Sequence, residues 1–152
     1  MTSAEKKSLA QKLGLKPGLS AAVVRAPEKY LREIGGATAD IKTIAADSDI
    51  TSLHKQLDFI HLFTRERTVL EKTFPELKEA LAPDGALWVS WPKASALMGS
   101  GPAPDINENV VREVGLTNGL VDVKVVSVDE TWSALKFVYR LADRGPSDKK
   151  RA

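Results

Sequence analysis

Two tryptophan-bearing segments offer the side chains best suited to holding a ligand. Trp91, Pro92 and Lys93 close an apolar run, and an aromatic side chain next to a cation at a strand end can form a ligand shelf. Trp132 stands in a short polar connection between two apolar runs. The alternative for both tryptophans is a structural role, in which Trp91 packs at the edge of a sheet and Trp132 packs a hairpin against a helix. The sequence leaves both interpretations open.

The remaining polar residues do not form a recognisable catalytic or metal-binding set. His54 and His61 are the only histidines, and neither has a partner at a metal-ligand spacing. His61 lies in an apolar run, which favours a packed, hydrogen-bonded histidine. Asp105 and Glu108 could act as an acid and base, but their spacing matches a helix capping box. Because cysteine is absent, thiolate metal sites and cysteine nucleophiles are excluded, and we predict no catalytic or metal-ligating residue.

The composition predicts one globular domain with a charged tail. The chain has 152 residues, of which 43% are hydrophobic and 28% charged. Residues 1–142 are expected to form the domain, and residues 143–152 a mobile basic tail. The tail contains four basic and two acidic residues, which account for the whole net charge of +2. The domain is therefore neutral overall, and we expect no nucleic-acid partner.

No segment has the pattern of an export signal or a membrane span. The first 13 residues are charged and lack an apolar core of signal-peptide length, and no apolar run approaches about 18 residues. The sequence therefore predicts a cytoplasmic protein that does not contact a membrane.

Apolar patterning predicts strands that alternate with helices. Strands are expected over residues 19–24, 42–46, 58–64, 86–91, 121–128 and 134–141. Helices are expected from a capping box at Thr2 and Glu5 to Gly14, over residues 28–34 and 70–81, and after a capping box at Asp105 and Glu108. Together these elements predict a small Rossmann-like α/β fold: a mostly parallel sheet, helices on both faces and a C-terminal antiparallel β-hairpin. The segment 58–64 is apolar on both alternating faces, which is typical of the centre of such a sheet.

Three interruptions of this pattern have local consequences. Pro75 is expected to kink or restart its helix. Pro83, Asp84 and Gly85 predict a turn before the strand at 86–91. Residues 94–104, rich in glycine, serine, alanine and proline, predict a mobile loop that could serve as a lid over a ligand site.

The carboxyl ends of the predicted strands meet at one rim, where open parallel sheets bind ligands. The candidate binding residues at this rim are Arg25, Pro27, Thr64, Arg65, Trp91, Lys93, Asn107, Trp132 and Ser133. Two predicted helices begin at the same rim, and their free backbone N–H groups favour anions. Arg25, Arg65 and Lys93 add positive charge. The rim therefore predicts a site for a small anionic ligand, with Lys93 as its central member.

The order of helix, Lys16-Pro17-Gly18 turn, strand and helix, with a terminal hairpin, resembles a shortened class I methyltransferase fold. Such enzymes place a glycine-rich loop after the first strand, where the backbone approaches S-adenosylmethionine. Here that turn, residues 24–28, reads VRAPE and has no glycine. Without glycine the backbone is not expected to take a positive φ, which argues against S-adenosylmethionine and dinucleotides. We therefore predict no cofactor.

Three segments are similar to the small bacterial Rossmann-like proteins grouped as domain of unknown function 3052. They are residues 12–18 (KLGLKPG), 90–93 (SWPK) and 129–137 (DETWSALKF). The resemblance runs from about Leu9 to Arg140. It implies the fold and assigns no activity.

These observations favour a Rossmann-like protein without enzymatic activity that binds a small anionic ligand or a protein partner at the rim. The missing glycine loop is the main argument for this interpretation. One alternative is a divergent S-adenosylmethionine-dependent methyltransferase or other transferase. A second is a protein-interaction module that uses the antiparallel edge of the sheet and the termini.

Overall fold

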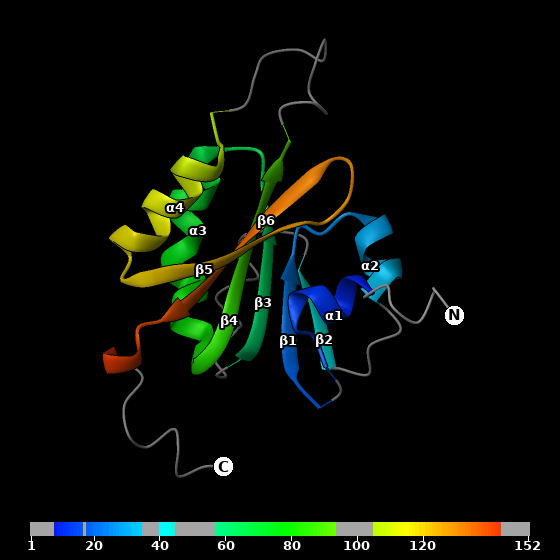
Figure 1. Cartoon of the computed structure of the whole chain (residues 1–152), viewed down its shortest axis with the longest axis horizontal. Helices are drawn as coiled ribbons and strands as arrows, with labels where there is room; N and C mark the ends of the chain where they lie inside the picture. Colours follow the sequence, from blue (N-terminus) through cyan, green and yellow to red (C-terminus); the bar gives the residue numbers. More distant parts are fainter. Residues whose placement is uncertain (1–7, 17, 35–39, 45–56, 94–104, 144–152) are drawn as a thin grey trace.

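The chain forms one mixed sheet flanked by helices (Figure 1). The computed structural model describes residues 8–16, 18–34, 57–93 and 105–143, together with the backbone of residues 40–44. The strands are β1 (Ser20–Val24), β2 (Asp40–Ile44), β3 (Leu57–Phe63), β4 (Leu81–Pro92), β5 (Leu120–Ser127) and β6 (Trp132–Tyr139). The helices are α1 (Leu9–Leu13), α2 (Glu28–Ile34), α3 (Arg67–Ala80) and α4 (Glu108–Thr117), with a short 3-10 turn at Leu141–Asp143.

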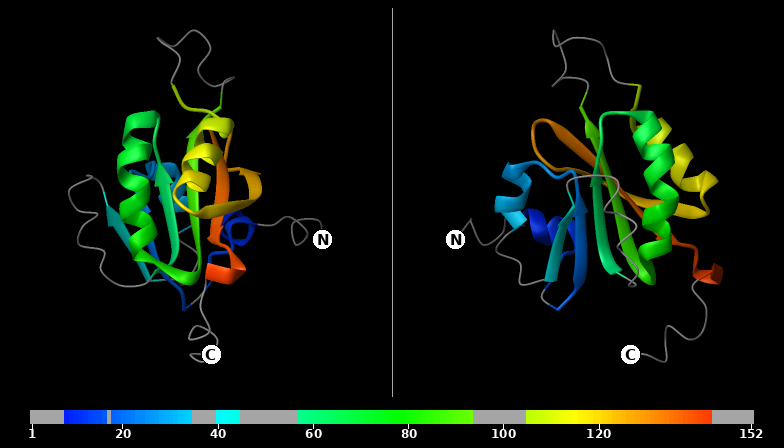
Figure 2. Two further views of the ribbon diagram at one scale, coloured as in Figure 1. Left: turned by 90° about the vertical axis from the view of Figure 1, so that its left-hand side faces the viewer. Right: turned by 180° about the vertical axis from the view of Figure 1, so that it is seen from behind.

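The sheet has the order β2-β1-β3-β4-β6-β5. The first four strands of this order run parallel, and β6 is antiparallel to both β4 and β5. Helices α1 and α2 cover one face, and α3 and α4 cover the other (Figures 1 and 2). The predicted α/β fold, with its mostly parallel sheet and C-terminal hairpin, is confirmed.

Strand β3 is the centre of the sheet because its side chains are buried on both faces. Ile60 and Leu62 pack into the apolar cluster beneath α3 and α4. Phe59 and Phe63 pack into the second cluster, beneath α1 and α2. An uninterrupted apolar run on a strand is the pattern that burial on both faces requires.

Helix α1 begins and ends with local signals. The Ser8 side chain accepts a hydrogen bond from the Gln11 backbone N–H, and the Gln11 side chain accepts one from the Ser8 N–H. This reciprocal capping box satisfies two backbone donors that a helix start leaves free. Gly14 ends the helix with φ +78°, a left-handed conformation that glycine adopts without steric cost. The capping box expected at Thr2 and Glu5 lies outside the described residues.

Helix α4 starts later than the sequence suggests, and the expected capping box of Asp105 and Glu108 is wrong. Asn107 is the N-cap, and its side chain accepts from the Val110 N–H at 2.9 Å. Asp105 instead accepts from the backbone N–H of Arg67, at the start of α3. Glu108 forms an ion pair with Arg112. Asp105 therefore joins the starts of two helices.

Neither a new helix start at Pro75 nor a turn at residues 83–85 occurs in the described structure. Helix α3 continues through Pro75. Proline has no backbone N–H, so the Glu71 carbonyl lacks its helical hydrogen-bond donor. Both Glu71 and Pro75 are exposed to solvent. Water can therefore satisfy that carbonyl. Strand β4 continues through the expected turn at residues 83–85, with an irregular register against β3. Gly85 permits this close pairing, since a Cβ there would lie 2.8 Å from the Leu57 carbonyl oxygen.

Among the described helices none is long and apolar enough to cross a membrane. The predicted loop at residues 94–104 and most of the predicted tail, residues 144–152, lie outside the described residues.

Candidate functional site

A pocket of about 250 Å³ opens at the carboxyl ends of β1 and β3, beside the start of β6. It is lined by Arg25, Phe63, Thr64, Arg65, Glu66, Val69 and Trp132, and we call it the rim pocket. From β1 the chain places β2 on one side and then crosses to place β3 on the other. This reversal of strand order is the position where open α/β sheets bind their ligands. Four of the predicted rim residues therefore meet where such a site is expected.

The turn after β1 has a strained backbone. Arg25 has φ +59° and is the only residue other than glycine with a positive φ in the described chain. The left-handed region is sterically unfavourable for residues with a Cβ, and such residues concentrate at functional sites. The expectation that a glycine-free turn would not take a positive φ is wrong. The surrounding fold imposes on Arg25 the backbone conformation that glycine would adopt more easily.

The turn after β3 is held by a buried threonine. Thr64 is 5% exposed, and its hydroxyl accepts a hydrogen bond from the Glu66 N–H at 3.1 Å. The Thr64 N–H donates to the Ser90 carbonyl at 3.2 Å, which ties the turn to β4. These hydrogen bonds fix the backbone of the turn. Arg65 and Glu66, which are exposed on it, line the rim pocket.

Trp132 forms the aromatic wall of the rim pocket. The Asp129 carboxylate accepts hydrogen bonds from the N–H groups of Thr131 and Trp132, at 2.8 and 2.9 Å. The Trp132 ring meets Phe63 edge-on, with centroids 5.2 Å apart and an interplanar angle of 84°. The Trp132 side chain is partly exposed, so the ring presents aromatic surface to the pocket. Asp129 thus fixes the backbone that carries this ring.

A buried chain of polar groups supports the wall from behind. The Tyr30 hydroxyl and His61 Nδ1 are 2.7 Å apart, and His61 Nε2 and the Ser90 hydroxyl are also 2.7 Å apart. The His61 ring stacks on Phe63 at a centroid distance of 4.3 Å. Burial lowers the pKa of His61 to about 3, and burial raises the pKa of Tyr30. His61 is therefore neutral at physiological pH, and the prediction of a packed, hydrogen-bonded histidine is confirmed.

Trp91 and Lys93 lie outside the rim pocket. Trp91 is 6% exposed and belongs to the apolar cluster beneath α3 and α4. The Lys93 ammonium donates to the Ser127 hydroxyl at 2.6 Å, and the Lys93 N–H donates to the Thr131 carbonyl at 2.7 Å. Trp91 is thus a core residue, and Lys93 directs its charge toward β5.

Three other predicted rim residues have structural contacts and do not line the pocket. Asn107 caps α4. The Pro27 carbonyl accepts from the Leu31 N–H in the first turn of α2. Ser133 pairs with Trp91 on β4 within the sheet. Sequence reasoning missed Phe63, Glu66 and Val69, although the first two flank the predicted Thr64 and Arg65.

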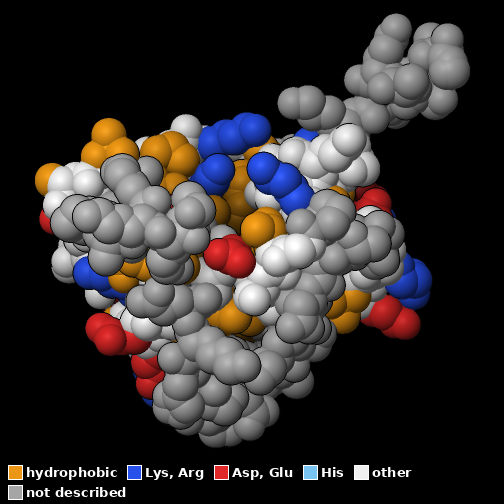
Figure 3. Space-filling model, turned by 90° about the horizontal axis from the view of Figure 1, so that it is seen from below, with side chains coloured by type: hydrophobic (Ala, Val, Ile, Leu, Met, Phe, Trp, Pro, Cys, Tyr) orange, Lys and Arg blue, Asp and Glu red, His pale blue; other side chains and the backbone are white. Residues whose placement is uncertain are grey.

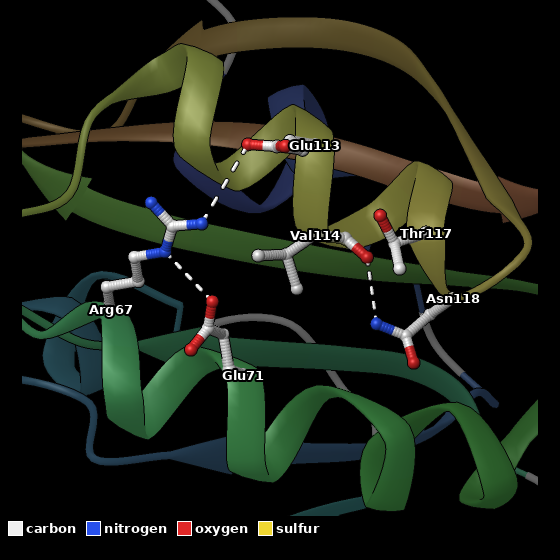
Figure 4. Close-up of a pocket in the computed structure, with 6 residues that line it drawn as sticks. All are labelled: Arg67, Glu71, Glu113, Val114, Thr117 and Asn118. Carbon is white, nitrogen blue, oxygen red and sulfur yellow. Dashed lines mark hydrogen bonds and ion pairs between the residues drawn. The ribbon is translucent and has the colours of Figure 1, made fainter.

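A second hollow lies between α3 and α4, and its polar lining groups already have partners (Figure 4). It measures about 320 Å³. Arg67 forms ion pairs with Glu71 at 2.8 Å and with Glu113 at 3.9 Å. The Asn118 amide donates to the Val114 carbonyl at 2.8 Å. These polar groups satisfy one another, so the rim pocket is the better candidate for a ligand site. No group of three potential metal ligands occurs among the described residues.

Several solved structures that share this fold are methyltransferases. One from Aquifex aeolicus has a TM-score of 0.62 and 19% identity, over 85% of this chain and 86% of that one. Magnesium protoporphyrin IX methyltransferase from Synechocystis PCC 6803, with bound SAH, has a TM-score of 0.55 and 14% identity, over 87% and 80%. A TehB-like methyltransferase from Corynebacterium glutamicum has a TM-score of 0.57 and 11% identity, over 91% and 92%.

At these identities the likeness establishes the Rossmann-like methyltransferase fold. No protein-family model matches the sequence, and no curated protein matches it, so membership of the domain of unknown function 3052 family stays a prediction. The interpretation as a non-enzymatic binding protein is corrected, because solved methyltransferases share the fold. The likeness favours the alternative of a divergent methyltransferase.

Proposed function

We propose that this chain is a divergent S-adenosylmethionine-dependent methyltransferase that binds its cofactor at the rim pocket. The observation that supports the proposal is the position of this pocket, at the switch point of a sheet with the methyltransferase fold. The left-handed turn at Arg25 adds support, because strained backbone is typical of ligand sites.

The residues of the rim pocket match the chemical groups of this cofactor. Arg25 and Arg65 carry guanidinium groups, which suit the methionine carboxylate. Glu66 carries a carboxylate, which suits the ammonium and sulfonium cations. Trp132 presents an aromatic surface for the adenine ring, in the way that bases stack on tryptophan in other proteins. Acidic, basic and aromatic side chains are thus all available in one place.

In this proposal the chain binds and orients the cofactor, and the bound cofactor supplies a methyl group on a positively charged sulfur. The arginines fix the carboxylate end, and the wall of Trp132 and Phe63 excludes water from the adenine side. The pocket, at about 250 Å³, is somewhat smaller than the roughly 300–1,000 Å³ of pockets that enclose a whole ligand. At this size the pocket would hold only part of the cofactor.

Isothermal titration calorimetry with S-adenosylmethionine tests the proposal. We expect saturable binding to the wild type, and weaker binding to Trp132→Ala. Stacking of a base on an aromatic ring is worth about 1–3 kcal/mol by alanine substitution, so affinity should fall about five- to 150-fold. Arg65→Ala should also weaken binding, because it removes a partner of the carboxylate.

Arg140→Ala is the matched control, since Arg140 is exposed and follows the end of β6 opposite to Trp132. Its affinity should equal that of the wild type. If the folded wild type gives no binding heat at millimolar cofactor, the proposal is contradicted. Equal losses in Trp132→Ala and Arg140→Ala would remove the assignment to the rim pocket.

A further inference from the structure

The amino-terminal edge of the parallel strands carries a third hollow, remote from the rim pocket. Its volume is about 400 Å³. It is lined by Leu13, Gly14, Lys16, Leu19, Asp58, Phe59, Asp84, Ala86 and Lys136, and we call it the lower pocket. Seen from below, basic side chains gather around a hollow with an apolar floor (Figure 3). Residues of α1, β3, β4 and β6 therefore converge on a second concave surface.

Three lysines concentrate positive charge at this surface. Lys136 and Lys124 stand directly opposite each other on β6 and β5, and Lys16 lines the lower pocket together with Lys136. Within the described part of the chain, no hydrogen bond or ion pair involves any of these three ammonium groups. Burial, followed by the charges of Lys124 and Lys16, lowers the pKa of Lys136.

Like charges opposite each other on neighbouring strands are destabilising. The fold nevertheless holds these lysines together beside a cavity, and an anion bound there would remove the repulsion. Such a cost at a concave surface is typical of a binding site.

The other walls restrict the kind of anion. Leu13 and Phe59 are each 1% exposed, and they form part of an apolar floor. Asp58 and Asp84 place carboxylates on the wall, and Asp58 is anchored by the Ser20 N–H at 3.0 Å. Carboxylates repel anionic groups but accept hydrogen bonds from hydroxyls. A ligand that pairs with both the lysines and the carboxylates carries its negative charge at one end and hydroxyl groups at the other.

We propose that the lower pocket binds a small sugar phosphate, with the phosphate at Lys16 and Lys136 and the sugar hydroxyls at Asp58 and Asp84. Lysine ammonium groups are common phosphate ligands, and two or three of them match the charge of a phosphate monoester. A volume of about 400 Å³ lies within the range of small-molecule pockets. The site is separate from the rim pocket and does not depend on methyltransferase activity.

Calorimetric titration of the full chain with ribose 5-phosphate, at low ionic strength, tests the proposal. Lys136→Met removes the charge and retains a long apolar side chain. We expect Lys136→Met to weaken binding about tenfold or more, because it removes a charge-assisted contact. Lys72→Met is the control, since Lys72 is an exposed residue of α3, and it should bind as the wild type does.

Two further measurements separate a binding role from a structural one. Without ligand, the melting temperature of Lys136→Met should equal or exceed that of the wild type, because the repulsion with Lys124 is gone. Ribose 5-phosphate should bind about tenfold more tightly than inorganic phosphate, because only the sugar reaches the carboxylates. No binding of ribose 5-phosphate, equal affinity in Lys136→Met and wild type, or equal affinity for the two phosphates would each overturn the proposal.

Discussion

Replacing Trp88 with alanine is expected to lower the free energy of unfolding by about 3–5 kcal/mol. Trp88 is fully buried on β4, in the cluster beneath α1 and α2. Its indole N–H donates to the Leu13 carbonyl at 3.0 Å, which ties α1 to the sheet. Alanine leaves a cavity and removes the donor. Urea denaturation followed by circular dichroism measures the effect without relying on tryptophan emission.

Two matched variants separate the sources of this loss. Trp88→Phe keeps most of the ring volume but leaves the Leu13 carbonyl without its partner, which costs about 1–3 kcal/mol. Trp132→Phe alters a partly exposed ring and should cost less. The expected order of loss is Trp88→Ala, then Trp88→Phe, then Trp132→Phe. A loss below about 1 kcal/mol in Trp88→Ala would show that Trp88 does not anchor α1.

Acidification is expected to destabilise the fold through His61. Burial lowers the pKa of His61 from 6.5 to about 3 in the folded chain. Between these two values the unfolded chain holds a proton that the folded chain lacks, so stability rises with pH. This contribution is constant above pH 6.5 and declines as pH falls toward 3, by about 1.4 kcal/mol per unit. By pH 4.5 the loss from this group is about 3 kcal/mol.

Urea denaturation of wild type and His61→Gln between pH 7 and pH 4.5 isolates this effect. The glutamine variant should be less stable at pH 7 but should lose less stability on acidification, because glutamine does not titrate. Tyr30→Phe removes the hydroxyl that pairs with His61 and leaves the histidine buried, so it should keep the wild-type slope. Parallel pH profiles for wild type and His61→Gln would contradict a neutral buried His61.

The regular elements could be predicted because their signals are local. Helix α2 matches its expected range of 28–34, since Pro27 precedes it and a glycine pair follows it in the sequence. Strand β3 was recognised because burial on both faces requires an uninterrupted apolar run.

The helix caps depended on partners that the sequence does not reveal. Asp105, Asn107 and Glu108 are all polar residues near the start of α4, and each has a side chain able to accept a hydrogen bond. Asp105 is engaged by the Arg67 N–H, 38 residues away in the chain, and Asn107 takes the capping position. The expected capping box failed because a tertiary contact competed with the local one.

The rim pocket was partly predictable from the order of the strands. Arg25, Thr64 and Arg65 follow the ends of parallel strands, so topology alone brings them together. Trp91 ends a strand as well, but its side chain faces the apolar cluster beneath α3 and α4. The left-handed turn at Arg25 was not predictable, because local preference opposes it and only the packed fold imposes it.

Nuclear magnetic resonance of the isotope-labelled chain, titrated with S-adenosylmethionine, tests most directly whether the cofactor binds at the rim pocket. The backbone amide signals of Arg25, Thr64 and Trp132 should shift progressively and saturate. Those of Lys16 and Lys136, in the lower pocket, should stay in place. An unchanged spectrum at millimolar cofactor, or shifts confined to residues outside the rim pocket, would contradict the proposal that this fold binds S-adenosylmethionine at its rim.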